Sequence, residues 1–144
     1  MHLDVAELQS FYDSHLGQIA RRLIRQRLRD VWPSVRGQAV LGLGYATPYL
    51  RPFQEEAGRI VALMPAQQGV AHWPVGPTSL TALADESFLP LPDASFDRVI
   101  VAHSLETSEA LRPLLRQIWR VLTPSGRLIV IAPNRTSLWA QFEM

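Results

Sequence analysis

The chain has 144 residues, of which 47% are hydrophobic and 19% charged, a composition that fits one globular domain with a substantial core. The formal net charge of +1 gives no overall field for nucleic acid, and the lack of cysteine excludes disulfides, thiolate nucleophiles and cysteine-based zinc sites. The sequence has no run of about 18 apolar residues, the length needed to span a bilayer, and its first residues do not have the pattern of a secretion signal. We therefore expect a cytoplasmic protein with neither a membrane nor a nucleic-acid partner.

Apolar residues at spacings of mostly three to four predict a helical segment within residues 1–36 that packs on the rest of the domain. They are Leu8, Tyr12, Leu16, Ile19, Leu23, Leu28 and Val31. Trp32-Pro33 ends this pattern. The intervening arginines fall on the other faces: Arg21, Arg22, Arg25, Arg27 and Arg29. Two interpretations of these arginines stay open, a solvated helix face or a docking surface for an anionic partner.

Strand and helix patterns then alternate, which is typical of an α/β fold with a parallel sheet. Five strands are expected, at 39–43, 59–64, 79–84, 98–102 and 127–132. The fourth and fifth are rich in Val and Ile and are expected to be buried on both faces. The segment 66–77, rich in Gly and Pro, is expected to be an irregular loop.

Two helices are expected between these strands. The first begins at Thr47, whose hydroxyl can cap the free amides, with Pro48 at the first helical position; Pro52 should shorten or bend it. The second carries one continuous apolar stripe for packing on the sheet, made of Leu111, Leu114, Leu115, Ile118, Trp119 and Leu122. The turn-forming residues 123–126 end it.

Three segments of this chain carry a family resemblance. VLGLGYATP resembles the glycine loop VLDLGCGTG, LADESFLPLPDASFDRVIVAHSLE resembles the acidic residue and "SFD" entry to a fourth strand, and IWRVLTPSG resembles the "RVLkPGG" turn before a fifth. Over about residues 37–134 the chain thus resembles the class I S-adenosylmethionine-dependent methyltransferases, type 11 branch. The resemblance implies a three-layer α/β sandwich with a Rossmann-like, mostly parallel sheet of order 3-2-1-4-5, formed by residues 37–144 and lacking the family's last strands.

The resemblance also implies a cofactor, S-adenosylmethionine, and the residues that would bind it. They are Leu43, Gly44, Tyr45, Ala46, Met64, Pro65, Asp85, Glu86, His103 and Ser104. Gly44 and Ala46 would let the backbone approach the cofactor closely, and Asp85 would accept a hydrogen bond from its adenine amino group. No catalytic residue can be assigned, because methyl transfer depends mainly on alignment of acceptor and methyl group.

Two departures from the family pattern weaken the expected site. Gly42 stands where the family usually has an acidic loop residue, and Met64-Pro65 stands where it has an Asp or Glu that binds both ribose hydroxyls. A hydrogen bond to a charged group contributes roughly 1.5 to 3 kcal/mol, so each lost bond weakens binding about tenfold to a hundredfold.

Structural interpretations of the same residues stay open. Gly42 and Gly44 fit a tight strand-to-helix turn, and Asp85 with Glu86 fits a solvated turn. His103 fits a core histidine, a pocket-lining residue or a proton-transfer group. The four histidines show no metal spacing such as HExxH, so no metal site is expected.

The function expected from the resemblance is methyl transfer from S-adenosylmethionine to an unidentified, small-molecule acceptor. The alternative is a catalytically degenerate methyltransferase fold that acts as a binding or assembly module; a nicotinamide-binding domain is disfavoured because the third glycine and the strand-two acid are lacking. Strand 127–132 would be an apolar sheet edge, so we expect self-association through it or a chain that is part of a longer polypeptide.

Overall fold

A computed structural model describes residues 5–65, 79–85, 87–104, 108 and 110–131, and contains a five-stranded, fully parallel sheet of order β3-β2-β1-β4-β5. The strands are β1 (Ala39–Gly44), β2 (Arg59–Pro65), β3 (Ser79–Ala84), β4 (Phe96–Ala102) and β5 (Leu122–Ile131). The helices are α1 (Val5–Asp13), α2 (His15–Val31), α3 (Thr47–Leu50), the 3₁₀ helix η1 (Arg51–Phe53) and α4 (Leu111–Val121). The predicted fold class and strand order are confirmed.

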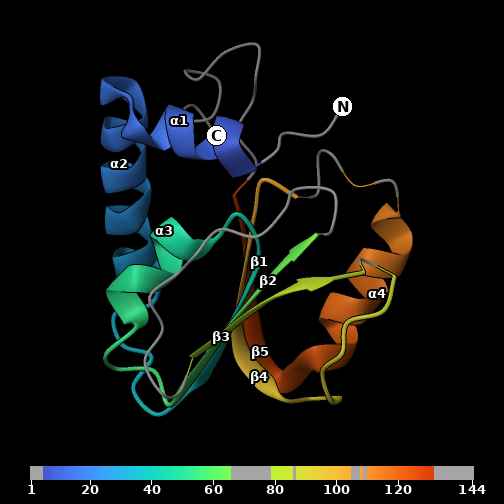
Figure 1. Ribbon diagram of the computed structural model, residues 1–144. Helices are drawn as coiled ribbons and strands as arrows, with labels where there is room; N and C mark the ends of the chain where they lie inside the picture. The colour runs from blue at the N-terminus through green and yellow to red at the C-terminus, as the bar shows by residue number, and fades with distance from the viewer. Residues whose placement is uncertain (1–4, 66–78, 86, 105–107, 109, 132–144) are drawn as a thin grey trace.

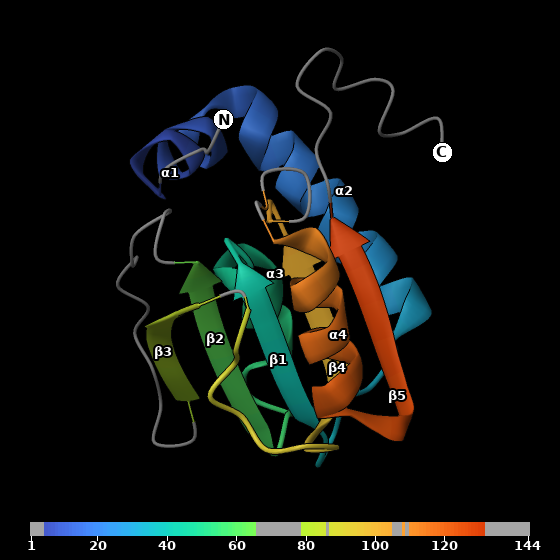
Figure 2. The ribbon, with the colours of Figure 1, turned by 90° about the vertical axis from the view of Figure 1, so that its right-hand side faces the viewer.

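The sheet lies between two helical layers, with α2 and α3 on one face and α4 on the other (Figures 1 and 2). Alternating residues of β1 and β4 pack into two separate hydrophobic cores, because successive side chains of a strand point to opposite faces of the sheet. Val40 and Ile100 pack on the α2 and α3 side, whereas Leu41 and Val99 pack on the α4 side. This double burial explains the nearly continuous apolar sequences of the central strands.

The N-terminal segment forms two helices rather than a single one. Ser14 caps α2, its hydroxyl accepting a hydrogen bond of 3.1 Å from the Gly17 N–H. At Gly17 a Cβ would lie 1.9 Å from the Phe11 carbonyl oxygen, so only glycine permits this close approach of the two helices. As predicted, α2 ends just before Trp32-Pro33.

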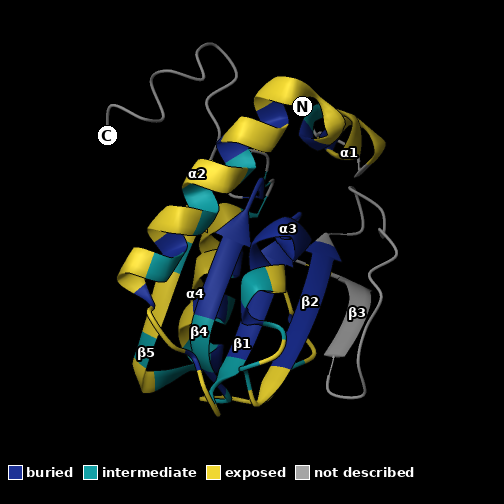
Figure 3. Cartoon of the chain, turned by 90° about the vertical axis from the view of Figure 1, so that its left-hand side faces the viewer, coloured by how far each residue is buried: buried dark blue, intermediate teal, exposed yellow. Residues whose placement is uncertain are grey.

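The apolar face predicted for this segment is wrong for four of its seven residues. Leu8, Tyr12 and Leu28 are buried, but Leu16, Ile19, Leu23 and Val31 are exposed. The break at Ser14 turns α2, so that Gly17 and Ala20 face the core instead. Figure 3 shows the exposed outer face of α2.

Arginines hold α2 against the α3–η1 segment. The Nε atom of Arg25 donates to the carbonyl oxygen of Pro48 at 2.7 Å. Arg29 donates to Glu56 Oε1 at 2.7 Å and to the carbonyl oxygen of Pro52. The pKa of the Glu56 carboxyl is lowered most by the hydrogen bond from Arg29 and next by the hydrogen bond from the Val35 N–H. Two arginines of the basic sequence run therefore have structural roles.

The helix predicted to begin at Thr47 is observed as α3, but its N-terminal capping differs from the prediction. Ala46, not Thr47, is the N-cap of α3, and no side chain caps the helix. Thr47 is itself buried within the short helix, which places Pro48 in its first turn. The chain continues as η1 through Pro52, so the predicted shortening at that proline is confirmed.

The apolar stripe predicted for α4 is also only partly correct. Leu114, Ile118 and Val121 are buried against the sheet, whereas Leu111, Leu115 and Trp119 are exposed. Leu122 already belongs to β5, which begins there rather than at Arg127. Leu128 and Val130 of β5 are exposed, so this strand is not buried on both faces as predicted.

The structure provides no helix, within the described ranges, that is long and apolar enough to cross a membrane. The predicted loop at 66–77 lies outside the described residues.

Candidate functional site

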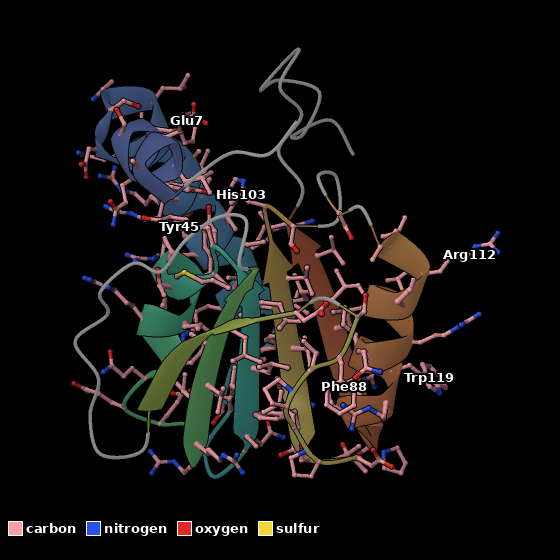
Figure 4. All side chains as sticks on the ribbon, turned by 45° about the vertical axis from the view of Figure 1, so that its right-hand side comes forward. Glu7, Tyr45, Phe88, His103, Arg112 and Trp119 are labelled. Atoms are coloured by element: carbon pink, nitrogen blue, oxygen red, sulfur yellow. The ribbon has the colours of Figure 1, made fainter. Side chains whose placement is uncertain are left out.

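Six of the ten predicted site residues lie at the carboxyl ends of β1 and β4, at 43–46 and 103–104. The strand order reverses between these two strands, and ligands of open parallel sheets bind at such a switch point. Gly44 ends β1 and pairs with Ala102, which ends β4. Tyr45 follows β1, and His103 follows β4. Figure 4 shows Tyr45 and His103 together at this edge of the sheet, below the N-terminal helices.

Gly44 is required by the backbone geometry of this edge. Its φ is +79°, and a Cβ would lie 2.1 Å from the carbonyl oxygen of Ala102 and 2.9 Å from the Cβ of Ser104. The Tyr45 N–H donates to the same Ala102 oxygen at 2.9 Å. The loop after β1 is thus pulled onto β4, where any side chain at position 44 would be excluded.

Gly42 is required for a different reason. A Cβ there would lie 2.5 Å from Leu50 Cδ1 and 3.0 Å from the Cβ of Ala46. The leucine side chain therefore occupies the space beside Gly42, where the resembled family places a carboxylate. Leu43 and Ala46 are buried on either side of this loop.

A hydrogen-bonded group formed by Tyr12, Tyr49 and His103 lies beside the loop. The Tyr12 hydroxyl is 2.6 Å from the Tyr49 hydroxyl and 2.5 Å from His103 Nε2. Since Tyr12 has only one hydroxyl proton, it donates in at most one of these bonds. The Tyr12 ring also stacks on Tyr45, with 5.8 Å between ring centroids.

Burial shifts the pKa of each of these three side chains in the direction that favours its neutral form. It lowers the pKa of His103 to about 4 and raises that of Tyr49 to about 12. The pKa of Tyr12 is raised by burial and then by Tyr49, and that of Tyr45 by burial and then by Asp13. At neutral pH, His103 is therefore an uncharged imidazole.

This group fastens α1 over the carboxyl edge of the sheet. Tyr12 comes from α1, Tyr49 from α3 and His103 from the end of β4, so three elements meet at one hydroxyl. Figures 1 and 2 show α1 above the tips of the strands. His103 has a φ of +56°, which non-glycine residues adopt rarely and which is often found at functional sites.

The other predicted residues lie farther along the same edge. Met64 is buried near the end of β2, and Pro65 ends that strand. Asp85 directly follows β3, is exposed, and its Oδ1 accepts from the Ser87 N–H at 2.8 Å. Ser104 is buried beside Gly44. Glu86 lies outside the described residues.

Two residues of this hydrogen-bonded group, Tyr12 and Tyr49, were not among the predicted site residues. Tyr12 was predicted only as part of the apolar helical pattern. Tyr12 and His103 are 91 positions apart, and no local pattern indicates that they meet. A metal centre finds no support among the described residues, which contain no cluster of three or more potential ligands.

Comparisons with known proteins support a single family. The family described as "Methyltransferase domain" matches residues 40–130. A demethylmenaquinone methyltransferase of Deinococcus radiodurans is 46% identical over 43 residues, which are 30% of this chain and 18% of that protein. The chain therefore aligns with less than a quarter of this relative's length.

Two solved structures share the fold. An S-adenosylmethionine-dependent methyltransferase of Mesorhizobium loti is 25% identical with a TM-score of 0.58, over 73% of this chain and 50% of that one. The [4+2]-cyclase SpnF is 26% identical with a TM-score of 0.62, over 79% of this chain and 45% of that one. The family match, at residues 40–130, covers more than half of this chain and includes the glycine loop and nearly all of the sheet. The chain therefore belongs to the methyltransferase-domain family.

Proposed function

We propose that the chain transfers a methyl group from S-adenosylmethionine to a small-molecule acceptor. The observation that carries this proposal is the Gly44 loop, which combines a left-handed glycine, a close approach to β4 and the switch point of the sheet. The family membership supports the same reaction. When bound, the cofactor supplies an electrophilic methyl group, and the protein's task is to align the acceptor with it.

The described residues fit the cofactor unevenly. The backbone of Leu43 to Ala46 would lie along its methionine part, and Asp85 would accept from its adenine amino group, with Glu86 as its neighbour. On the ribose side, Met64 and Pro65 offer no carboxylate. Near the cofactor's amino group, the loop has Gly42 in place of an acidic residue, and Leu50 fills the space beside it. His103 and Ser104, after β4, would line the acceptor side.

Isothermal titration with S-adenosylhomocysteine tests this proposal without knowledge of the acceptor. We expect binding with a Kd on the order of tens of micromolar or weaker, because the ribose carboxylate is missing. An absence of heat at millimolar ligand would contradict the proposal.

Variants of Asp85 test where the ligand binds. Asp85→Ala should weaken binding about tenfold to a hundredfold, since it removes one charged acceptor. Asp85→Asn keeps an oxygen for the Ser87 N–H and controls for loss of the turn. Glu55→Ala, an exposed change between η1 and β2, should leave the affinity unchanged. Equal affinity of Asp85→Ala and the parent would assign Asp85 to the turn alone.

The second candidate is a methyltransferase fold without methyl transfer, serving as a binding or assembly module. Gly42 and Met64 favour it, because both positions lack the carboxylate of the resembled family. The [4+2]-cyclase SpnF has the same fold. A chain that binds no S-adenosylhomocysteine yet is folded would support this second function.

A further inference from the structure

An open groove lined by arginines runs along the outer side of α2. Its volume is about 530 Å³, and Pro52 of η1 forms part of its wall. The α2 residues that line it are Gln18, Arg21, Arg22, Arg25, Gln26, Arg29 and Asp30. The lining thus combines four guanidinium groups and two amides with one carboxylate.

Among the described residues, the four arginines of this groove are accompanied by one carboxylate in the lining, Asp30, and one ion-pair partner, Glu56. Arg29 is paired with Glu56, and Arg25 binds the carbonyl oxygen of Pro48, which has no net charge. Burial lowers the pKa of Arg25, and the like charges of Arg21 and Arg51 lower it further. These arginines therefore repel one another, and an anion in the groove would relieve the repulsion.

An apolar stripe adjoins the groove on the same helix. Leu16, Ile19 and Leu23 follow one another at spacings of three and four, and their exposed fractions are 49%, 38% and 44%. Arg22 is three positions from Ile19, so the charged and apolar surfaces meet along the helix. Both belong to the outer face of α2 seen in Figure 3.

We propose that α2 docks this protein on a bilayer that contains anionic phospholipids. The arginines Arg21, Arg22 and Arg25 would bind lipid phosphates, while Leu16, Ile19 and Leu23 would enter the boundary between headgroups and acyl chains. Basic residues beside an exposed apolar stripe are typical of helices that lie on membranes.

Two other occupants fit this face less well. A nucleic acid would use the arginines but would leave the apolar stripe in water. A second copy of the chain, joined symmetrically through α2, would place two arginine grooves against each other. The expectation of no membrane partner came from the lack of a spanning segment, which a helix lying on the surface does not need. The proposal is also independent of methyl transfer.

Vesicle cosedimentation of the full chain tests the proposal. Binding is expected to vesicles of phosphatidylglycerol mixed with phosphatidylcholine, to be far weaker for phosphatidylcholine alone, and to decrease with rising salt. Arg21→Gln with Arg22→Gln should weaken binding about thirtyfold, at roughly one kcal/mol per arginine near a charged surface. Ile19→Gln with Leu23→Gln should also weaken it, although the charge is unchanged.

The matched control removes two arginines from the other side of the sheet. Arg112→Gln with Arg116→Gln changes exposed residues of α4, where Arg112 points into solvent (Figure 4), and should bind like the parent. Equal loss in this control, or equal binding to both vesicle types, would overturn the proposal. So would binding of pyrophosphate or single-stranded RNA without vesicle binding. The salt dependence of the parent decides the question if a variant does not fold.

Discussion

His103 combines three properties that rarely occur together in one residue. It is 2% exposed, it has a left-handed backbone, and its Nε2 shares a short hydrogen bond with Tyr12. Burial favours the neutral imidazole, and this accounts for its pKa of about 4. Its protonation state is therefore coupled to the packing of α1 over the sheet.

This coupling predicts a loss of stability in weak acid. In the unfolded chain the histidine titrates near 6.5, so between pH 6.5 and 4 the unfolded state binds more protons and stability falls as the pH falls. We expect the free energy of unfolding to decrease by about 2 kcal/mol from pH 7 to pH 5 on account of His103. Urea denaturation at the two pH values measures it.

Two variants isolate the contribution of His103 to this pH dependence. His103→Gln keeps a hydrogen-bonding group near Tyr12 but has no proton to gain, so its stability should change little between pH 7 and pH 5. His15→Gln, at the exposed start of α2, should retain the decrease seen in the parent. A parent whose stability is the same at both pH values would contradict the prediction.

At the scale of elements, one arginine joins α4 to the segment that precedes β4. Arg120 donates to the carbonyl oxygen of Leu91 at 2.7 Å and to that of Leu89 at 2.9 Å. Its ion pair with Asp93 adds little, because that carboxylate is exposed. From the same helix, Gln117 Oε1 accepts from the Leu89 N–H at 3.1 Å. The arginine of the RVLTPSG motif thus fixes the segment that begins with Asp85.

Arg120→Ala should destabilise the protein by about 2 kcal/mol, because it leaves partly buried carbonyl groups without their charged donor. Arg120→Lys should restore only part of this loss, since an ammonium cannot bridge both carbonyls in the same plane. Thermal unfolding followed by circular dichroism measures both. Arg116→Ala, at an exposed position of the same helix, is the control. Equal melting temperatures for Arg120→Ala and Arg116→Ala would refute the role of Arg120.

The order of these elements was predictable from sequence, whereas their orientation was not. Strand and helix patterns alternate locally, and three family-like motifs fixed the strand order. The apolar spacing within residues 8–31 predicted one continuous helix face and did not indicate the break at Ser14, which depends on the contact between Gly17 and Phe11. The Tyr12–His103 bond joins residues 91 positions apart in the sequence, and only the tertiary fold determines it.

At the scale of the whole molecule, exposed apolar residues gather at the β5 end of the sheet. Leu128 and Val130 lie on the α4 side of β5, opposite Val99 and Val101 of β4 in the strand register. Leu111, Leu115 and Trp119 belong to the flank of α4 that leaves the core, and Trp119 is 82% exposed. In the described part of the chain, β5 pairs only with β4, so its outer backbone groups form a sheet edge. Exposed, apolar edges of this kind pair readily with other chains.

We therefore expect the isolated chain to self-associate through the β5 edge. Multi-angle light scattering should give a mass above the 16.2 kDa of a monomer, increasing with concentration. Leu128→Lys with Val130→Lys places charges on the exposed side of this strand and should shift the mass toward the monomer, since edge lysines oppose pairing. Ile19→Lys with Leu23→Lys, on α2, adds the same charge elsewhere and should leave the association unchanged. A parent that remains monomeric at high concentration, with rapid amide exchange along β5, would show that the edge is tolerated in water.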